Sequence, residues 1–443
     1  MKIKILILLL TIAVGSPCEA QFFKKLVNKV GETVEETVIR KIDNKSGRKT
    51  EKVLDTLLDT KVGSKNKKRK ATQQKEEIGS EIEVANNPQF KEEASPFKAY
   101  SKFDFVSGEK LIAFDDFSQD EVGDLPAKWN STNSVEVVTL EGIDGKWAKL
   151  VEGKGAFVPD FITEFPENFT LEFDVVYDFD ISQYCFQRYL SVVFSDIENP
   201  SYDLNYDRPG KNGFVFTLSG GIGYNGYLNY QKYTPDRQLN TSANTENLYL
   251  NTDNLGRGKV LHVSIWRQKQ RMRVYFDKEK VFDIPRAFEK GVAINTARFF
   301  SNISELEMYF FISNLRYAVG KPDMRSKLIT EGRLVTYGIT FDVNSAHINP
   351  ASYGTLKQIA SILKEYPDIQ VTIVGHTDAD GSEEANLTLS ERRAKAVKLA
   401  LIFDFSVPEG QLASIGKGES ELIDTGSSPD SKAKNRRVEF IKN

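Results

Sequence analysis

The arrangement of apolar and polar residues predicts different elements in successive parts of the 443-residue chain. Between residues 100 and 320, segments such as FTLEFDVVYDF (169–179) and MRVYFD (272–277) alternate apolar and polar residues. A two-residue period is typical of antiparallel strands with one buried and one solvated face. This region is therefore predicted to be an all-β sandwich of about 12 strands.

Beyond residue 325 the pattern predicts strands that alternate with helices. Strands are expected at 334–341, 369–375, 412–416 and 437–441. Helices are expected at 350–366 and 383–403. Pro350 at the start of the first helix and Pro367 after its end agree with these limits. Residues 325–443 are therefore predicted to form an α/β sandwich with helices on one face of a sheet.

The region before the sandwich is charged. Residues 21–75 hold 16 Lys and Arg against 7 Asp and Glu, with apolar residues four apart, which predicts a basic amphipathic helical arm. The arm fits three roles: a solvated spacer, a weak oligomerisation helix, or contact with an anionic membrane surface or wall polymer. Residues 76–99 lack periodicity and are expected to be a flexible linker.

Residues 1–20 are expected to be a cleaved signal peptide. Lys2 and Lys4 precede the apolar run ILILLLTIAVG, which is too short to span a bilayer permanently. Lipidation of Cys18 is an alternative, although Pro17 before it departs from the pattern of lipoprotein sites. Without these residues the formal charge is 57 minus 61, or −4, and Cys185 is the remaining cysteine, which excludes an internal disulfide.

Candidate chemistry concentrates in VTIVGHTDADGSEEANLTLSERRAKAV (371–397). Asp378 follows the end of an apolar strand, and Arg393 comes from the helix expected to pack back over it. A carboxylate and a guanidinium fixed side by side can hold a zwitterion, because Asp accepts from an ammonium and Arg binds a carboxylate with two parallel hydrogen bonds. An ordinary structural salt bridge is the alternative.

This stretch resembles the core motif of the OmpA-like C-terminal domain, a peptidoglycan-binding module. The resemblance extends to ITFDVNSAHI (339–348) and AKNRRVEF (433–440), so three motifs occur in the family's order. It implies that Asp378 and Arg393 bind the ammonium and carboxylate of diaminopimelate in the stem peptide. It also implies a pocket lined by the neighbouring polar residues Asn344, Thr377, Asn386 and Arg436.

Two other stretches resemble a concanavalin/laminin-G-like jelly roll: FDDFSQDEVGDLPAKWN (114–130) and HVSIWRQKQRMRVYFDKEKVFDIPRAF (262–288). The resemblance implies a glycan-binding or adhesive module, although this fold also serves as a plain spacer. Exposed aromatic side chains that stack on sugar rings would support the glycan role. The candidates are Tyr224, Tyr227, Tyr230 and Tyr233.

A polysaccharide hydrolase is a further alternative for the β region. Glu172 and Asp174 share one face of a predicted strand, as the catalytic carboxylates of jelly-roll glycosidases do. Tyr177 stands where a third acid is expected, so the sequence favours two exposed acids on a solvated face. An outer-membrane β-barrel is the remaining alternative, against which the irregular spacing of the strands argues.

The sequence therefore predicts a multidomain envelope protein of the periplasm or outer membrane. A signal peptide and a charged arm precede an all-β jelly-roll sandwich (100–320) and an OmpA-like domain (325–443) that anchors the protein to peptidoglycan. Neither enzymatic activity nor a cofactor, metal or nucleic-acid partner is expected. A glycan or another envelope protein is the expected partner of the sandwich.

Overall fold

The computed structural model describes residues 103–443 except 152, 182–187, 209–211, 221–225, 234–238, 248, 252, 304–307 and 322. The chain divides into two compact units, Met1–Ala94 and Ser95–Asn443. The predicted signal peptide, basic arm and linker lie outside the described residues, as do Cys185 and Tyr224. Within the described part of the chain, none of the helices has the length and apolar character needed to cross a membrane.

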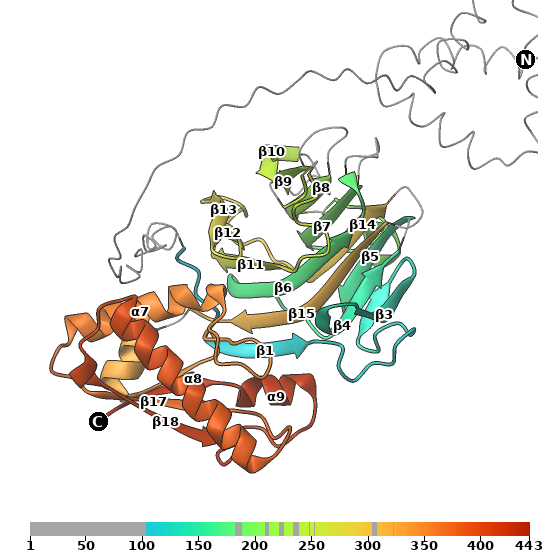
Figure 1. Cartoon of the computed structure of the whole chain (residues 1–443). Coiled ribbons are helices and arrows are strands. Elements are labelled where there is room, and N and C mark those ends of the chain that lie inside the picture. Colours follow the sequence, from blue (N-terminus) through green and yellow to red (C-terminus); the bar gives the residue numbers. More distant parts are fainter. Residues whose placement is uncertain are drawn as a thin grey trace, which may run out of the picture. The chain divides into compact units, whose positions relative to one another are not determined.

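The first half of the described chain is largely β-sheet and forms two antiparallel sheets (Figure 1). One sheet has the order β13-β12-β11-β6-β15-β4-β3, and β1 also pairs with β15. Its strands are β1 (Lys110–Asp115), β3 (Val135–Leu140), β4 (Ile143–Leu150), β6 (Asn168–Asp178), β11 (Leu261–Gln268), β12 (Arg271–Phe276), β13 (Glu279–Ile284) and β15 (Tyr309–Val319).

The other sheet has the order β10-β9-β8-β7-β14-β5-β2. Its strands are β2 (Trp129–Ser131), β5 (Gly153–Pro159), β7 (Arg188–Ser195), β8 (Gly213–Gly220), β9 (Gly226–Tyr233), β10 (Leu239–Asn247) and β14 (Thr296–Ile303), and a short helix α6 (Pro200–Asp203) follows β7. The described sheets thus hold 8 and 7 strands, more than the 12 predicted. A strand as short as β2, with three residues, has too few positions to show a period.

Aromatic and β-branched side chains from both sheets form one continuous core. Leu171, Phe173 and Val175 of β6 point into it, as their alternation predicts. Trp129 stacks on Phe157 with ring centroids 4.1 Å apart. Burial of these large side chains is the main contribution to the stability of the β region.

The predicted solvated face of β6 is wrong, because the segment before β1 covers it. The Gly108 amide donates to Thr170 Oγ1 over 3.0 Å, and Ser107 Oγ donates to Glu172 Oε1 over 2.9 Å. Glu172 is only 5% exposed as a result. The alternation correctly separates apolar from polar residues here, but the polar face is buried too.

The C-terminal region forms a four-stranded sheet in the order β16-β19-β17-β18. Strands β17 and β18 are parallel, and the other two pairings are antiparallel. The strands are β16 (Arg333–Thr336), β17 (Val371–His376), β18 (Leu412–Gly418) and β19 (Val438–Lys442). The helical elements are η2 (Ser326–Thr330), η3 (Pro350–Ser352), α7 (Tyr353–Glu365), α8 (Glu383–Phe403), η4 (Glu409–Gln411) and α9 (Pro429–Asn435).

The differences from the sequence prediction include a shorter β16 and the additional helix α9. The strand expected at 334–341 ends at Thr336, whose Oγ1 accepts from the Gly338 amide, and Phe341 forms only an isolated bridge with Ile348. Helix α9 was not predicted, although Ser428 caps it by accepting from the Ser431 amide and Pro429 stands in its first turn.

The core of the C-terminal region continues into the β region. Phe103, Phe105, Trp266 and Tyr275 belong to the same apolar cluster as residues of α7, α8, β17 and β19. A Cβ atom at Gly354 of α7 would lie 1.8 Å from the Phe105 carbonyl oxygen, so only glycine permits this close approach. Residues 103–106 therefore stabilise the C-terminal sheet as well as the sandwich.

Candidate functional site

The candidate site lies where β17 ends and α8 packs against the sheet. A Cβ atom at Gly375 would lie 2.4 Å from the Ser390 carbonyl oxygen, and one at Gly416 would lie 2.4 Å from the Glu391 amide nitrogen. These glycines let α8 approach β17 and β18 closely. Ser382 caps α8 by accepting from the Ala385 amide over 3.3 Å. Tight packing thus brings the helix to the loop that follows β17.

Asp378 is held by two contacts in that loop. Its Oδ2 accepts from Arg436 Nη1 over 2.6 Å, and its Oδ1 accepts from the Asp380 amide over 3.3 Å. The Asp378 side chain is 13% exposed and that of Arg436 is 34% exposed. The acid therefore reaches the surface, where a cation of the protein already neutralises it.

Arg393 projects from α8 toward the loop between Phe341 and Asn349. Its Nε donates to the Ser345 carbonyl over 2.9 Å, and its Nη2 donates to the Asp342 carbonyl over 3.3 Å. Its guanidinium lies 5.0 Å from the centre of the Phe341 ring. Burial, helped by Arg436 and opposed by Asp378, lowers the pKa of Arg393 to about 10. Arg393 is therefore cationic at neutral pH, with Asp378 close enough to act on its charge.

The structure brings Asp378, Arg393 and Arg436 together, but the direct contacts differ from the simplest expectation. Among the described residues, no hydrogen bond joins Asp378 to Arg393, and Arg436 is the direct partner of Asp378. From the sequence, Arg436 is a candidate site residue only because it belongs to the motif AKNRRVEF (433–440). The ion pair between Asp378 and Arg436 links the ends of two strands that are far apart in sequence.

The other three candidate residues surround this trio. Asn386 is buried, and its Nδ2 donates to the Asp380 carbonyl over 3.0 Å and to Glu419 Oε2 over 2.5 Å, which fixes the Asp378 loop. Thr377 Oγ1 is buried and has no hydrogen-bond partner within the described residues. Asn344 is exposed at φ 51° in the loop whose carbonyls bind Arg393.

Two aromatic contacts of the site are not among the residues selected from the sequence. Phe341 lies in the ITFDVNSAHI motif, so a search for rings beside the candidate arginines finds it. Phe114 on β1 lies 5.3 Å, ring centre to guanidinium, from Arg436. No local pattern connects Phe114 to a site more than 250 positions later in the chain, since only the tertiary fold brings them together.

A polar network around the buried Glu439 lies beneath the site. Arg333 donates to both carboxylate oxygens of Glu439 over 2.9 Å each, and Arg437 Nε donates to Glu439 Oε1 over 2.8 Å. Burial raises the pKa of Glu439, but the hydrogen bonds from Arg333 and Arg437 outweigh it and lower the pKa. His376 Nε2 is 3.5 Å from Glu439 Oε1. Burial, helped by Arg437, lowers the pKa of His376 to about 4.

His376 is expected to make the fold sensitive to mild acid. Its folded pKa lies below its ordinary value of 6.5, so the unfolded chain binds more protons between pH 6.5 and 4 and stability falls in that window. Lowering the pH from 7 to 4.5 is expected to cost about 2 kcal/mol through this residue. Urea denaturation should show a smaller drop for His376→Asn than for the wild type.

The matched control is His347→Gln, which replaces an exposed histidine and should keep the wild-type pH dependence. Glu439 contributes its own pH dependence only as the pH falls below its ordinary value, outside the measured window. An equal loss of stability in His376→Asn and the wild type would contradict the assignment.

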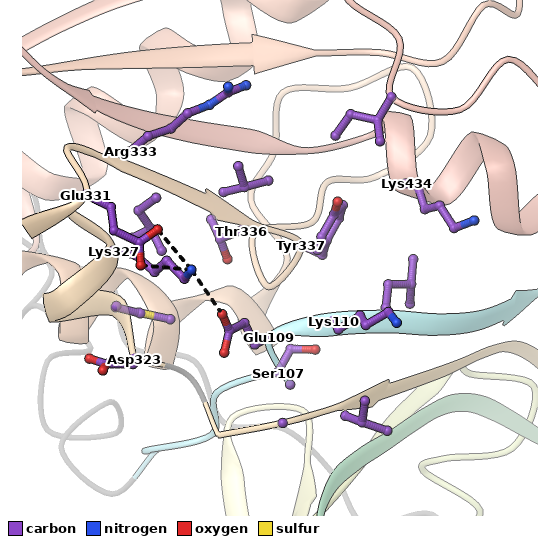
Figure 2. Close-up of a pocket in the computed structure, with 18 residues that line it drawn as sticks. Ser107, Glu109, Lys110, Asp323, Lys327, Glu331, Arg333, Thr336, Tyr337 and Lys434 are labelled. Atoms are coloured by element: carbon purple, nitrogen blue, oxygen red, sulfur yellow. Dashed lines mark hydrogen bonds and ion pairs between the residues drawn. The ribbon is translucent and has the colours of Figure 1, made fainter. Parts of the chain in front are cut away.

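A separate cavity of 1100 Å³ lies beside β1, η2 and β16 (Figure 2). Figure 2 shows Lys327 reaching toward Glu331 and Glu109, with nitrogen-to-oxygen distances of 3.0 Å and 3.9 Å. Arg333 and Lys434 on its wall bind Glu439 and Asp424. These charged groups of the cavity are thus paired within the protein.

The carboxylates proposed for a hydrolase are largely enclosed. Glu172 lies 3.6 Å from His262 Nε2 and 3.9 Å from Arg316 Nε, and Asp174 binds His262 Nδ1 over 2.7 Å. Burial lowers the pKa of His262, but hydrogen bonds that its ring donates to the carboxylates of Asp174 and Glu172 outweigh burial and raise the pKa to about 10. The expectation of two exposed acids is wrong for Glu172, which a polysaccharide cannot reach.

The tyrosines selected for sugar stacking are largely packed. Tyr230 lies against Phe214 and Phe282 in the sandwich core, and Tyr233 is buried with its hydroxyl donating to Gln231. Of the described candidates, Tyr233 is therefore buried, and Tyr227 and Tyr230 are half-buried. Within the described residues, no group of three or more His, Cys, Asp or Glu side chains is placed to hold a metal ion.

Comparison with known proteins identifies the class of the C-terminal region. The OmpA family matches residues 340–436, so the chain carries an OmpA family domain there. The match includes Asp378, Arg393 and Arg436 and leaves the β region unassigned. The expected OmpA-like recognition is confirmed, while the jelly-roll resemblance of residues 100–320 stays a prediction.

The relatives include outer-membrane and peptidoglycan-binding proteins. Outer membrane porin F of Pseudomonas aeruginosa is 36% identical over 105 residues, which cover 24% of this chain and 30% of the porin. Probable lipoprotein YiaD of Escherichia coli is 41% identical over 102 residues, covering 23% and 46%. Peptidoglycan-binding protein ArfA of Mycobacterium tuberculosis is 39% identical over 109 residues, covering 24% and 32%.

Among solved structures, the peptidoglycan-associated lipoprotein from Burkholderia pseudomallei is 31% identical. The match covers 24% of this chain and 88% of that chain, with a TM-score of 0.23. The chain spans 30% to 46% of the length of the curated relatives named here, so the likeness concerns one domain.

Proposed function

We propose that the chain anchors itself non-covalently to peptidoglycan by binding the diaminopimelate of stem peptides. The single observation that carries the proposal is the convergence of Asp378, Arg393 and Arg436 in the OmpA family domain. Asp378 would accept hydrogen bonds from the ammonium, and Arg393 would donate to the carboxylate. Each such charge-assisted hydrogen bond contributes about 1.5–3 kcal/mol.

The geometry leaves Asp378 able to bind the ligand's ammonium and Arg393 able to bind its carboxylate. The two hydrogen bonds of Arg393 use Nε and Nη2, and its Nη1 makes none within the described part of the chain. Asp378 Oδ2 binds Arg436, whose half-buried side chain has solvent beside it. The ligand's ammonium would take the place of that guanidinium, and the freed Arg436 would be available to the carboxylate.

Anchoring by such a site depends on many stem peptides. Two charge-assisted contacts give modest affinity at one site, and the repeated ligands of a wall raise the effective concentration around each bound protein. The β region shares an apolar cluster with the OmpA family domain through Phe103, Phe105, Trp266 and Tyr275. Anchoring would therefore hold the β region at the wall as well.

The packing of Tyr230 against Phe214 and Phe282 and the burial of Tyr233 argue against the alternative of glycan binding at these two positions. We therefore propose that the OmpA family domain anchors the protein and that the β region is the domain that it displays at the cell envelope. Placement in the periplasm or at the outer membrane, after removal of residues 1–20, is part of the same proposal. A protease-protection assay on intact and permeabilised cells tests this placement. Protection from external protease before permeabilisation would support it.

Selectivity for diaminopimelate over lysine is the experiment that tests the proposed ligand. The lysine side chain carries the ammonium but lacks the carboxylate, so the contact to Arg393 is lost. We expect peptidoglycan with lysine at the third stem position to bind about 10- to 100-fold more weakly, in proportion to one charge-assisted contact. Co-sedimentation of the chain from residue 21 with both kinds of insoluble wall measures the ratio.

The control is the same wall after digestion of its stem peptides by an amidase, which leaves the glycan strands. Binding to the stripped glycan, or equal binding to both intact walls, would contradict recognition of the diaminopimelate side chain.

A further inference from the structure

A single side chain connects the proposed ligand site with the β region. At one end, the Arg436 guanidinium donates to Asp378 over 2.6 Å. On the other side, the same guanidinium lies 5.3 Å from the centre of the Phe114 ring on β1. A cation held over an aromatic face is attracted by the electrons of the ring. Phe114 therefore favours the position in which Arg436 covers Asp378.

Phe114 is itself fixed against the OmpA family domain. Its backbone amide donates to Asp430 Oδ1 of α9. Lys128 lies 3.6 Å from Asp430 Oδ2, and Gln119 Nε2 donates to the Ser427 carbonyl over 2.7 Å. Figure 1 shows α9 beside β1, where it covers the edge of that strand that does not pair with β15. The ring is thus fixed by its strand and by α9.

Charge repulsion opposes the position of Arg436. Burial lowers the pKa of both Arg393 and Arg316, and the Arg436 cation lowers it further in each, so Arg436 lies close enough to both guanidinium groups to be repelled by them. Asp378 and the Phe114 ring are the contacts that offset this repulsion. Removal of either should shift Arg436 outward, and its 34% exposure gives it room to move.

We infer that Phe114 is a positioning residue of the ligand site, through which the β region sets the affinity for the stem peptide by holding Arg436 on Asp378. The inference rests on the proposed function. An incoming ammonium must displace Arg436, and the ring makes that displacement harder. Loss of a partly exposed contact of this kind should strengthen ligand binding about two- to fivefold.

The test measures affinity and the position of Arg436 together. A soluble stem peptide containing diaminopimelate is titrated by calorimetry into the wild-type chain, Phe114→Ala and Phe114→Leu. Leucine keeps an apolar side chain but has no aromatic face, so both variants should bind about two- to fivefold more tightly. Ile112→Ala is the matched control, because Ile112 lies on the same strand, is apolar and is 39% exposed.

The second readout is the NMR signal of the Arg436 guanidinium, which the Phe114 ring shifts by its ring current. Both Phe114 variants should lose this shift without ligand, Phe114→Tyr should keep it, and a merely structural role would not change it. If the wild type binds the peptide but Phe114→Ala and Phe114→Leu keep its affinity or its Arg436 signal, the inference alone is overturned. Absence of wild-type binding would instead overturn the proposed function, and the inference with it.

Discussion

Replacement of Asp378 by asparagine is expected to weaken binding to diaminopimelate-containing peptidoglycan by about 10- to 100-fold. Asparagine keeps the shape of the side chain and removes its charge, so the contact to the ammonium loses its charge assistance. The variant also presents an NH₂ group, which repels an ammonium. Co-sedimentation with insoluble wall over a range of protein concentrations gives the apparent Kd of each variant.

The matched control for this substitution is Asp380→Asn. Asp380 lies two positions later in the same loop, is exposed and pairs with Lys432 over 2.8 Å. Its loss removes the same charge from the same loop without touching the proposed ligand contact, so it should bind within about twofold of the wild type. Equal weakening by both substitutions would show that general loop charge, and not Asp378, governs binding.

The second large effect is expected for Arg393→Lys, which should weaken binding about 10-fold or more. Lysine keeps the positive charge but lacks the planar guanidinium, in which Nη1 can donate to the carboxylate while Nε and Nη2 bind the loop carbonyls. It also cannot reproduce both donations to the Ser345 and Asp342 carbonyls. Leaving one of them unpaired should lower the free energy of unfolding by about 1–2 kcal/mol, as measured by urea denaturation.

The control here is Arg392→Lys, one position earlier on the exposed side of α8. It makes the same chemical change away from the loop and should alter neither binding nor stability. If Arg393→Lys is fully folded and keeps the wild-type affinity, recognition of the carboxylate by the Arg393 guanidinium is contradicted.

The C-terminal elements were predictable because local signals and burial agree there. Helix α8 runs from Glu383 to Phe403, the predicted limits, since Ser382 caps its start and Arg393, Ala394 and Val397 lie on its buried face. The strand before it, β17, is short and apolar and contains Gly375, which makes room for the helix. The motif that resembles the OmpA family therefore coincides with the elements that build the site.

The contacts across the fold were not predictable from local patterns. Alternation along β6 separates Leu171 and Phe173 from Glu172, but it does not show that Ser107 and Arg316 cover the acid. The spacing of Asp378 and Arg393 likewise does not show that Arg436 would be the direct partner of the acid. Such contacts depend on which distant segments meet, and two polar faces with the same sequence pattern can be solvated or buried.

The shared core has a practical consequence for experiments on the OmpA family domain. A fragment that begins at residue 325 would lack Phe103 and Phe105, which belong to the apolar cluster of α7 and the C-terminal sheet. Loss of these rings would expose apolar surface and destabilise the fragment. Binding measurements therefore belong on the chain from residue 21, in which Phe114 and Arg436 also keep their contact.

The most direct test of the account is a crystal structure of this chain with a stem peptide that contains diaminopimelate. We expect the side-chain ammonium to lie within hydrogen-bond distance of Asp378, the adjacent carboxylate to contact Arg393, and Arg436 to have left Asp378. A stem peptide bound elsewhere, such as in the cavity beside β1, η2 and β16, with the Asp378–Arg436 ion pair intact, would contradict it.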